Sequence, residues 1–230
     1  MKSSRRLANT WLCLAVLPLA CMTLLAQDAN DHGVIVFQGK PTWAWAMRPS
    51  TIVRPAVIPD ATKLYTIYSN LGSKTDTYDD KQATVVSGPS YGSGQQWIAQ
   101  PFIPKSNAEV TEIEVAVSYY SGTNGVTISL NTDKSSLPGK PLHTWNLTNL
   151  PTFGTCCKLD MIKDAKGLKV IKSKQYWIVA RTNKSTESTG DAWDFTWNDS
   201  IGKKAFNDGS GWQLNSGNLG ALGVFGTKTE

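Results

Sequence analysis

The sequence predicts an all-β fold, an antiparallel β-sandwich of jelly-roll type. Three observations support this prediction: apolar and polar residues alternate with a period of two, turn-forming residues separate the alternating segments, and no segment has the periodicity of an amphipathic helix. The alternation is clearest in residues 110–131, where Ile113, Val115 and Val117 lie on one side of an extended chain. Glutamates lie on the other side, which predicts a strand with one buried face.

The same stretch predicts a β-hairpin. Residues 121–125 are all turn formers, and they end in Asn124-Gly125, which tolerates the positive φ values of a tight reversal. The alternation resumes at Val126, so we expect a second strand to pair with the first and another sheet to cover their apolar face. The core is expected to draw on Ile113, Val115, Val117, Val126, Ile128, Leu130, Ile178 and Val224.

The other elements are expected to be short strands, because β-branched and aromatic runs alternate with Gly, Pro and Asn. A polar loop is expected at residues 73–80 and a turn at residues 133–139. A short edge strand is expected at residues 34–37. Further strands are expected at residues 64–69, 95–103, 142–150, 155–161, 168–171, 174–182, 192–198, 209–214 and 220–226. These elements define a sandwich domain over residues 63–228.

The N-terminal residues 1–26 have the features of a secretory signal peptide. A positive segment precedes an apolar run over residues 11–26, which is shorter than the roughly 20 residues that a membrane span requires. Residues 17–21 also resemble a bacterial lipoprotein box, with Cys21 as the acylated residue. Residues 27–62 contain four prolines and are interpreted as a proline-rich leader. We therefore expect a secreted, periplasmic or cell-surface protein with no transmembrane segment in the mature chain.

The charge of the mature chain argues against nucleic acid as a partner. Residues 1–26 carry three of the 23 basic residues and none of the 18 acidic ones, so the remaining 20 basic and 18 acidic residues give a net charge of +2. The sequence pI of about 9.0 is therefore largely a property of the precursor. No basic run or basic and aromatic stripe remains to contact a phosphate backbone.

Several short motifs follow one another along the predicted sandwich. They are Tyr65-Thr66-Ile67-Tyr68-Ser69-Asn70-Leu71-Gly72, Leu137-Pro138-Gly139, Gln175-Tyr176-Trp177-Ile178-Val179, Gly211-Trp212 and a Gly-rich terminal strand. In this order they resemble the choice-of-anchor R domain, a family of secreted bacterial proteins, over residues 64–227. The resemblance implies surface attachment through varied anchors, and it brings no established reaction or catalytic residues. The sequence ends at Lys228-Thr229-Glu230 without a hydrophobic tail or sorting motif, so any anchor is expected at the N-terminus.

Histidine-based catalysis is not expected. Outside the signal peptide the sequence has His32, in the leader, and His143, within an ordinary strand pattern, and it has no Gly-x-Ser-x-Gly elbow. A carboxylate pair is the alternative. Asp191 and Asp194 could serve as the acid and base of a glycosidase, although acidic residues beside loops are usually solvated.

One acidic segment could supply oxygen ligands to calcium. Asp76, Asp79 and Asp80 lie close together in the expected polar loop, and Asn207-Asp208-Gly209 is a second such segment. Neither has the spacing of an Asp-x-Asp-x-Asp-Gly loop, so solvated carboxylates are the competing interpretation. A structural calcium is the only cofactor that the sequence suggests.

Tryptophan provides the main functional signal, because the sequence contains nine. Trp177, inside an apolar run, is expected in the core. Trp145, Trp193 and Trp197 lie in strands flanked by polar residues, so each either packs in the core or presents its ring to stack on the apolar face of a sugar.

The adjacent Cys156 and Cys157 are the only cysteines outside the signal peptide. Export to an oxidising compartment favours disulfides, and each cysteine has only its neighbour as an intramolecular partner. Consecutive Cα atoms lie about 3.8 Å apart, which is shorter than the roughly 4.4 to 6.8 Å of ordinary disulfides. Either the two form a vicinal disulfide with a structural or redox-sensing role, or alternation sends one thiol inward and one outward, both reduced.

Taken together, the sequence favours a secreted or cell-surface, non-catalytic binding module whose expected ligand is an extracellular glycan or cell-envelope component. The alternatives are a carbohydrate-active hydrolase that uses Asp191 and Asp194, and a purely structural envelope protein. The candidate ligand-binding residues are Trp145, Trp193, Trp197, Asp191 and Asp194.

Overall fold

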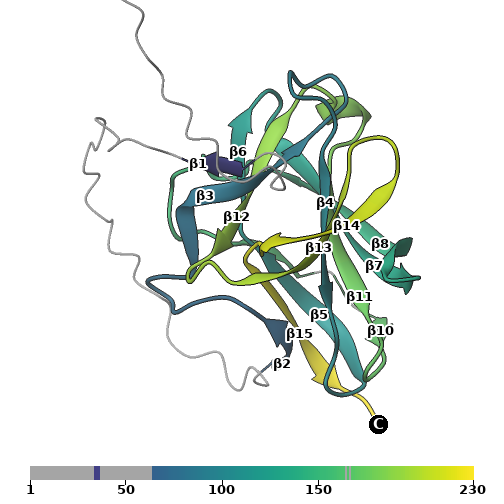
Figure 1. Cartoon of the computed structure of the whole chain (residues 1–230). Helices are drawn as coiled ribbons and strands as arrows, with labels where there is room; N and C mark the ends of the chain where they lie inside the picture. Colours follow the sequence, from purple (N-terminus) through teal and green to yellow (C-terminus); the bar gives the residue numbers. More distant parts are fainter. Residues whose placement is uncertain (1–33, 37–63, 164, 166) are drawn as a thin grey trace, which may run out of the picture. The chain divides into compact units, whose positions relative to one another are not determined.

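The computed structural model describes residues 34–36, 64–163, 165 and 167–230. The predicted signal peptide, the Cys21 lipoprotein site and most of the proline-rich leader lie outside these residues. The chain divides into Met1–Asn30 and Asp31–Glu230, and every described residue belongs to the second unit. The described residues form fifteen strands and one 3-10 turn, Lys184–Thr186 (Figure 1). Among them, no helix has the length and apolar character needed to cross a membrane.

The predicted all-β antiparallel sandwich is confirmed. The strands form three sheets of four, five and six strands, and every pairing between named strands is antiparallel. One core cluster takes side chains from all three sheets, so the sheets enclose a common interior.

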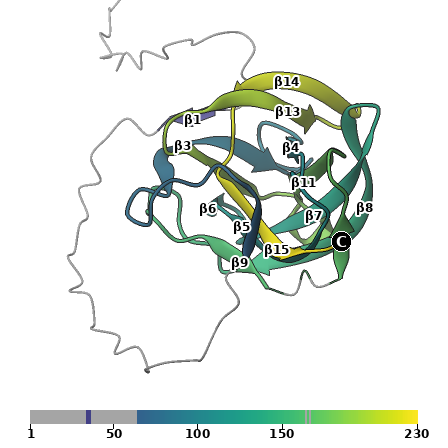
Figure 2. The ribbon, with the colours of Figure 1, turned by 90° about the horizontal axis from the view of Figure 1, so that it is seen from below.

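The six-stranded sheet is strongly curved. Its strand order is β14-β13-β4-β11-β7-β8, and its two edge strands, β14 and β8, approach each other across its concave face (Figure 2). The concave face points away from the common core. The strands are β4 (Trp97–Phe102), β7 (Gly125–Lys134), β8 (Leu137–Thr148), β11 (Tyr176–Arg181), β13 (Ile201–Asn207) and β14 (Trp212–Asn218).

The other two sheets form the opposite side of the core. The five-stranded sheet has the order β10-β5-β15-β2, and β9 pairs with the same edge of β5 as β10. Its strands are β2 (Tyr65–Ser69), β5 (Ala108–Val115), β9 (Asp160–Ile162), β10 (Leu168–Val170) and β15 (Leu222–Lys228). The four-stranded sheet has the order β1-β3-β12-β6. Its strands are β1 (Val34–Val36), β3 (Tyr78–Ser87), β6 (Val117–Ser121) and β12 (Gly190–Thr196).

These two sheets join at a bend around Ala116, the residue between β5 and β6. The Ala116 N–H donates to the Ala221 carbonyl at 3.2 Å, and the Asp194 N–H donates to the Ala116 carbonyl at 2.9 Å. The Ala221 N–H donates in turn to the Asp194 carbonyl at 2.8 Å. Because these backbone groups are paired at the bend, the chain can pass from one sheet to the next without burying unsatisfied amides.

The core contains the residues that the apolar and polar alternation predicted. All eight apolar residues predicted for the core belong to the main cluster, and none is more than 1% exposed. Burying a side chain of this size stabilises the fold by about 1.5–3 kcal/mol relative to leaving it in water. The expected edge strand near residue 34 is also confirmed, because β1 pairs with the outer edge of β3.

The predicted central hairpin is wrong. β6 pairs with β12 in the four-stranded sheet, whereas β7 lies between β11 and β8 in the six-stranded sheet. The turn-forming residues between β6 and β7 therefore connect the four-stranded sheet to the six-stranded sheet. The Asn124 side chain bonds both the N–H and the carbonyl of Leu150, and the Thr123 N–H donates to Thr189, so these groups tie the connection to other loops.

The tight hairpin connects β7 and β8. Ser135 and Ser136 both have positive φ values, 54° and 66°, as a two-residue turn of this kind requires. The expected turn at residues 133–139 is therefore shorter, and Leu137-Pro138-Gly139 belongs to β8. Three strands differ more widely from the prediction. β3 begins inside the expected polar loop, β13 was not predicted, and the strand expected at residues 155–161 overlaps β9 only at Asp160 and Met161.

Candidate functional site

The concave face of the six-stranded sheet has a floor of small side chains. The strand register aligns Ala205 with Ala99, Ala99 with Val179, and Val179 with Ser129, across β13, β4, β11 and β7. Directly paired residues project from the same face of a sheet, so these four side chains form a row across the strands. A row of small residues leaves a trough between its taller neighbours.

Larger side chains flank this row on both sides. In the next row of paired residues on this face, Trp97 of β4 is paired with Asn207, and Arg181 of β11 is paired with Thr127. One step in the other direction, Trp177 is paired with Asn131. The resulting cleft has a volume of about 300 Å³. It is lined by Trp97, Ser129, Asn131, Gly139, Pro141, Val179, Arg181 and Trp212.

One end of the concave face is closed. Leu137 of β8 and Trp212 of β14 both pack against a buried cluster that contains Trp177 and Val179. Trp177 is fully buried, as expected from its apolar run, and its indole Nε1 donates to Asp133 Oδ1 at 2.8 Å. Trp177 is thus covered and does not line the cleft, whereas Arg181 is half-buried and does, so the Arg181 end is the open one.

Asp133 itself is fully engaged by its neighbours. Gln175 Nε2 also donates to Oδ1, at 2.6 Å, and the Ser136 N–H donates to Oδ2 at 3.1 Å. Burial alone would raise the pKa of this carboxyl, but the hydrogen bonds, that from Trp177 foremost, outweigh it and hold the pKa below its ordinary value. Asp133 is therefore a charged anchor for the closed end.

The polar groups at the bottom of the cleft are held in place. Ser129 Oγ donates to Asn131 Oδ1 at 2.8 Å, and Asn131 Nδ2 donates to the Gly139 carbonyl at 2.8 Å. Both side chains are largely buried. Asn131 Nδ2 carries two hydrogens, so one N–H of a fixed amide remains for a ligand or water. Gly139 is needed here, because a Cβ at this position would lie 2.8 Å from Thr132 Oγ1.

The open end combines an aromatic ring with a cation. Trp97 is half-buried, and its Nε1 donates to Thr182 Oγ1 at 3.3 Å, which fixes the orientation of the ring. The Arg181 guanidinium carbon lies over this ring, 5.7 Å from its centroid. Trp212, also half-buried, provides a second ring from β14.

Arg181 is the only charged residue among the eight that line the cleft. A site with rings, amides and one guanidinium is suited to binding, because none of these groups is a general acid or base at neutral pH.

The tryptophans selected from the sequence do not line this cleft. Trp193 is 1% exposed in the core, and its Nε1 donates to the Ala221 carbonyl at 3.2 Å. Trp197 is 49% exposed and lies over Gly72, where a Cβ would contact its ring. Of the three predicted stacking residues, Trp197 is thus the one with an exposed ring.

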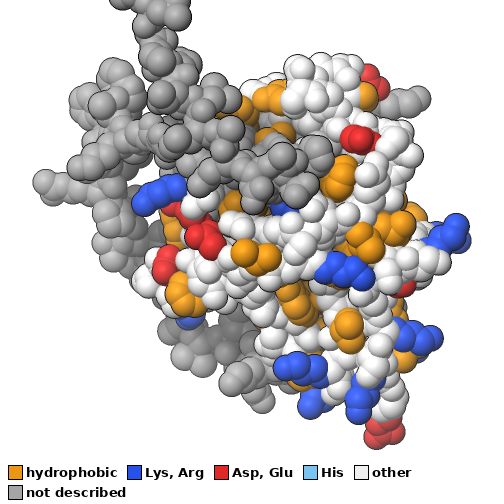
Figure 3. Space-filling model, in the orientation of Figure 1, with side chains coloured by type: hydrophobic (Ala, Val, Ile, Leu, Met, Phe, Trp, Pro, Cys, Tyr) orange, Lys and Arg blue, Asp and Glu red, His pale blue; other side chains and the backbone are white. Residues whose placement is uncertain are grey.

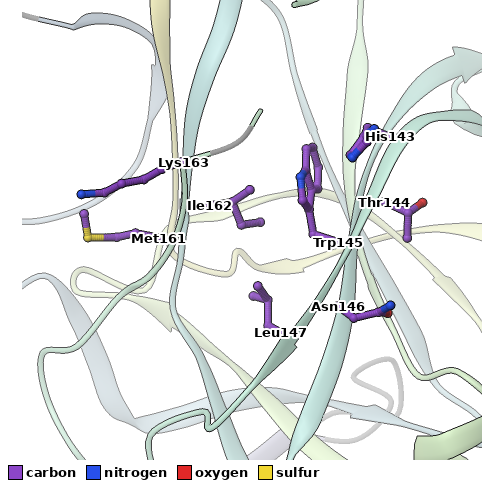
Figure 4. A pocket seen from close by; sticks show the side chains of 8 residues that line it. All are labelled: His143, Thr144, Trp145, Asn146, Leu147, Met161, Ile162 and Lys163. Atoms are coloured by element: carbon purple, nitrogen blue, oxygen red, sulfur yellow. The ribbon is translucent and has the colours of Figure 1, made fainter. Parts of the chain in front are cut away.

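Trp145 lines a different pocket, at the open edge between β8 and β9 (Figure 4). The pocket has a volume of about 700 Å³, and Trp145, Leu147 and Ile162 project into it. His143 packs beside the indole, with ring centroids 4.8 Å apart. Trp145 is 7% exposed and its Nε1 has no hydrogen-bond partner in the described part of the chain. Its lining combines these apolar side chains with His143, Thr144, Asn146 and Lys163, so the pocket has both apolar and polar walls.

The two predicted carboxylates lie on opposite faces of β12. Asp191 shares a face with Trp193, whereas Asp194 lies on the other face and accepts a hydrogen bond from Ser118 Oγ at 3.1 Å. Their side chains are 0% and 2% exposed. Burial raises the pKa of Asp191 to about 8 and that of Asp194 well above its ordinary value. A glycosidase requires both carboxyls to flank one bond, and this pair does not meet that requirement.

The predicted calcium ligands are dispersed. Asp76 is exposed, whereas Asp79 accepts hydrogen bonds from the Lys81 N–H at 2.8 Å and from Gln82 Nε2 at 3.2 Å. Among the described residues, no group of three His, Cys, Asp or Glu side chains is arranged to hold a metal ion. Asp76, Asp79 and Asp80 therefore do not form a common ligand set.

Cys156 and Cys157 form a vicinal disulfide across a cis peptide bond. Cys156 is exposed, and Cys157 packs against a small cluster that includes Tyr78. The Tyr78 hydroxyl donates to the Thr155 carbonyl at 2.7 Å and accepts from the Lys158 N–H at 3.0 Å, so it holds both ends of the cysteine loop. Burial raises the pKa of Tyr78 to about 12, which keeps the hydroxyl protonated.

The cleft was not predicted from the sequence, although part of its signal is present there. Trp97 and Ala99 alternate along β4, and small residues recur on the same face of β7 and β13. A small-residue position next to an aromatic one marks a depression in a sheet face. The alignment of four such positions depends on the register of strands that are far apart in the sequence. No family model matches the chain, and no curated protein shows significant similarity to it.

Proposed function

We propose that this protein is a secreted or cell-surface, non-catalytic β-sandwich module that binds a glycan in the cleft on the concave face. The observation that carries the proposal is the placement of Trp97 and Trp212 beside the fixed polar groups of Ser129 and Asn131. The apolar face of a sugar ring packs on indole, while its hydroxyls need amide and hydroxyl partners at defined positions.

The size of the cleft restricts the ligand. Its volume of about 300 Å³ is at the lower end of the range for small-molecule sites. A single sugar ring is therefore the expected occupant, either at the end of a glycan chain or as one residue bound within it.

The cellular setting of this proposal comes from the sequence. The signal-peptide features of residues 1–26 support a location outside the cytoplasm, where glycans are abundant surface components. The resemblance to the choice-of-anchor R family is consistent with a surface protein, and membership in that family is part of the proposal. On the face shown in Figure 3, Lys and Arg side chains lie mainly over the lower right half, several Asp and Glu side chains lie at the left edge, and uncharged groups separate them.

Binding is favoured over hydrolysis by the composition of the site. None of the eight residues that line the cleft carries a carboxyl or imidazole group. The hydrolase alternative would need Asp191 and Asp194 to act together, and they lie on opposite faces of one strand. A purely structural envelope protein is the remaining alternative, and the binding experiment separates it from the proposal.

The test is a glycan-array screen of the exported protein, followed by affinity measurements on the ligands found. Trp97→Ala and Trp212→Ala should each weaken binding by about 10-fold or more, because a buried aromatic contact is lost. Trp197→Ala is the matched control: it removes an exposed ring outside the cleft and should leave the affinity unchanged.

Circular dichroism and thermal melting show whether each variant is folded. The proposal fails if the wild-type protein binds no glycan. It also fails if folded Trp97→Ala and Trp212→Ala variants both keep the wild-type affinity.

A further inference from the structure

The open end of the cleft contains a guanidinium that has no counter-ion among the described residues. The inference drawn from it extends the proposed function, on which it depends. We infer that the bound sugar is acidic and that Arg181 recognises its anionic group, a carboxylate or a sulfate ester.

Arg181 has N–H donors that no described residue accepts. Its recorded interaction within the described residues is with the Trp97 ring, 5.7 Å from the guanidinium carbon, and no ion pair or hydrogen bond is made by its side chain there. A guanidinium has five N–H donors in a planar fork. Arg181 is half-buried, and a partly buried cation is usually paired. An oxyanion in the cleft would accept from two of these donors at once.

The residues that line the cleft supply no negative charge to balance Arg181. The other seven residues that line the cleft are uncharged. Asp133, at the far end of β7, directs one carboxyl oxygen to Trp177 and the other to the Ser136 N–H. A positive charge between low-dielectric walls attracts anions more strongly than the same charge on an open surface.

Trp97 holds the guanidinium in position before a ligand arrives. Its ring is fixed by the hydrogen bond to Thr182, and the cation lies over that ring. A pre-positioned donor loses little side-chain entropy when it binds an oxyanion. Lysine at position 181 would keep the charge but lose the planar fork.

The sequence spacing brings Arg181 within reach of a sugar on the floor. Val179 and Arg181 are two residues apart on one face of β11, which corresponds to about 6.6 Å along a strand. A sugar ring seated over Val179 and Ser129 can therefore present an exocyclic carboxylate or sulfate to the guanidinium. With a neutral sugar in the same position, the guanidinium N–H groups of Arg181 would remain hydrogen-bonded to water.

The experiment compares matched ligands that differ at one acidic group. Glycans ending in glucuronic acid and glucose, galacturonic acid and galactose, and sulfated and unsulfated galactose are tested with the exported protein at low and moderate salt. We expect the wild-type protein to bind at least one acidic glycan about 10-fold or more tightly than its neutral counterpart. The pair that shows the preference tells a carboxylate from a sulfate ester.

Variants assign the preference to Arg181. Arg181→Gln should reduce it to within about 2-fold, and Arg181→Lys should give an intermediate value. Lys81→Gln removes one positive charge from an exposed position on β3, outside the cleft, and should keep the wild-type preference.

The outcomes separate this inference from the proposed function. Equal binding of acidic and neutral glycans, or an unchanged preference in folded Arg181→Gln, overturns the acidic-sugar inference while glycan binding stands. The acidic-sugar inference is also overturned, and glycan binding stands, if the wild-type protein shows no acidic preference and the Trp97→Ala variant binds no glycan. Binding of free acetate or sulfate as tightly as the acidic glycan overturns it too, because the cleft would then be a simple anion site. No binding to any glycan overturns both proposals.

Discussion

At the scale of single residues, the least expected feature is the environment of Asp191. Both of its carboxyl oxygens are buried, and neither has a hydrogen-bond partner in the described part of the chain. Burial raises its pKa to about 8, whereas an aspartate in an unfolded chain titrates near 3.9. Between these values the unfolded chain releases a proton that the folded protein keeps. The stabilisation is therefore fully present below pH about 4 and is lost as the pH rises through about 8.

Asp191→Asn tests this linkage. The substitution removes the ionisable group at nearly constant volume, so the variant should match the wild-type free energy of unfolding near pH 4 and exceed it by several kcal/mol at pH 8. Urea titrations at both pH values measure the difference. Asp76→Asn, at an exposed carboxyl, is the control and should show no such pH-dependent gain. Parallel stability profiles for the wild-type protein and Asp191→Asn would contradict the assignment.

At the scale of elements, β3 connects the four-stranded sheet to the cysteine loop. Its first residue, Tyr78, is 2% exposed, and its hydroxyl bonds the carbonyl of Thr155 and the N–H of Lys158. Cys157 and Leu159 also pack against the small cluster of Tyr78, Ala116 and Ala221, so this hydroxyl and that cluster together hold the loop. The disulfide between Cys156 and Cys157 lies within the segment that Tyr78 fixes.

Tyr78→Phe should therefore destabilise the protein by about 1–3 kcal/mol, because it leaves a backbone donor and acceptor without their buried partner. Chemical denaturation gives the value, and limited proteolysis should show earlier cleavage near residues 155–158. The Tyr119→Phe variant removes an exposed hydroxyl contact with the Gly122 carbonyl and should cost less. Equal stability of Tyr78→Phe and the wild-type protein would show that the loop is held by other groups.

At the scale of the whole molecule, three sheets depend on one core. Val115 illustrates this, because β5 pairs it with Leu222 of β15 on one side and with Asp160 of β9 on the other. It is completely buried in the cluster to which all three sheets contribute. A change at this position affects the packing of every layer.

Val115→Asp should cost several kcal/mol, since it buries a charge with no partner and places it beside Asp160. A large fall in melting temperature is the expected result. Ile201→Asp, at a side chain that is 73% exposed, is the control and should change the stability by no more than about 0.5 kcal/mol. An unchanged melting temperature in Val115→Asp would rule out the common core.

The sequence by itself determined the fold class and the identity of the core. Alternation with a period of two is a local property, because successive side chains of any strand point to opposite faces. Residues such as Ile113, Ile128 and Val224 could therefore be assigned to the interior without knowing their neighbours, and all are buried. The signals at the N-terminus are likewise local and stay predictions about residues outside the described structure.

The tertiary structure alone decided which strands pair and where a site can form. The expected hairpin failed because β6 and β7 each found partners elsewhere, and local alternation holds no information about pairing. The cleft depends on the register of β13, β4, β11 and β7, which brings Ala205, Val179 and Ser129 into one row. The burial of Asp191 has the same origin, since a carboxyl loses its water only when distant segments close over it.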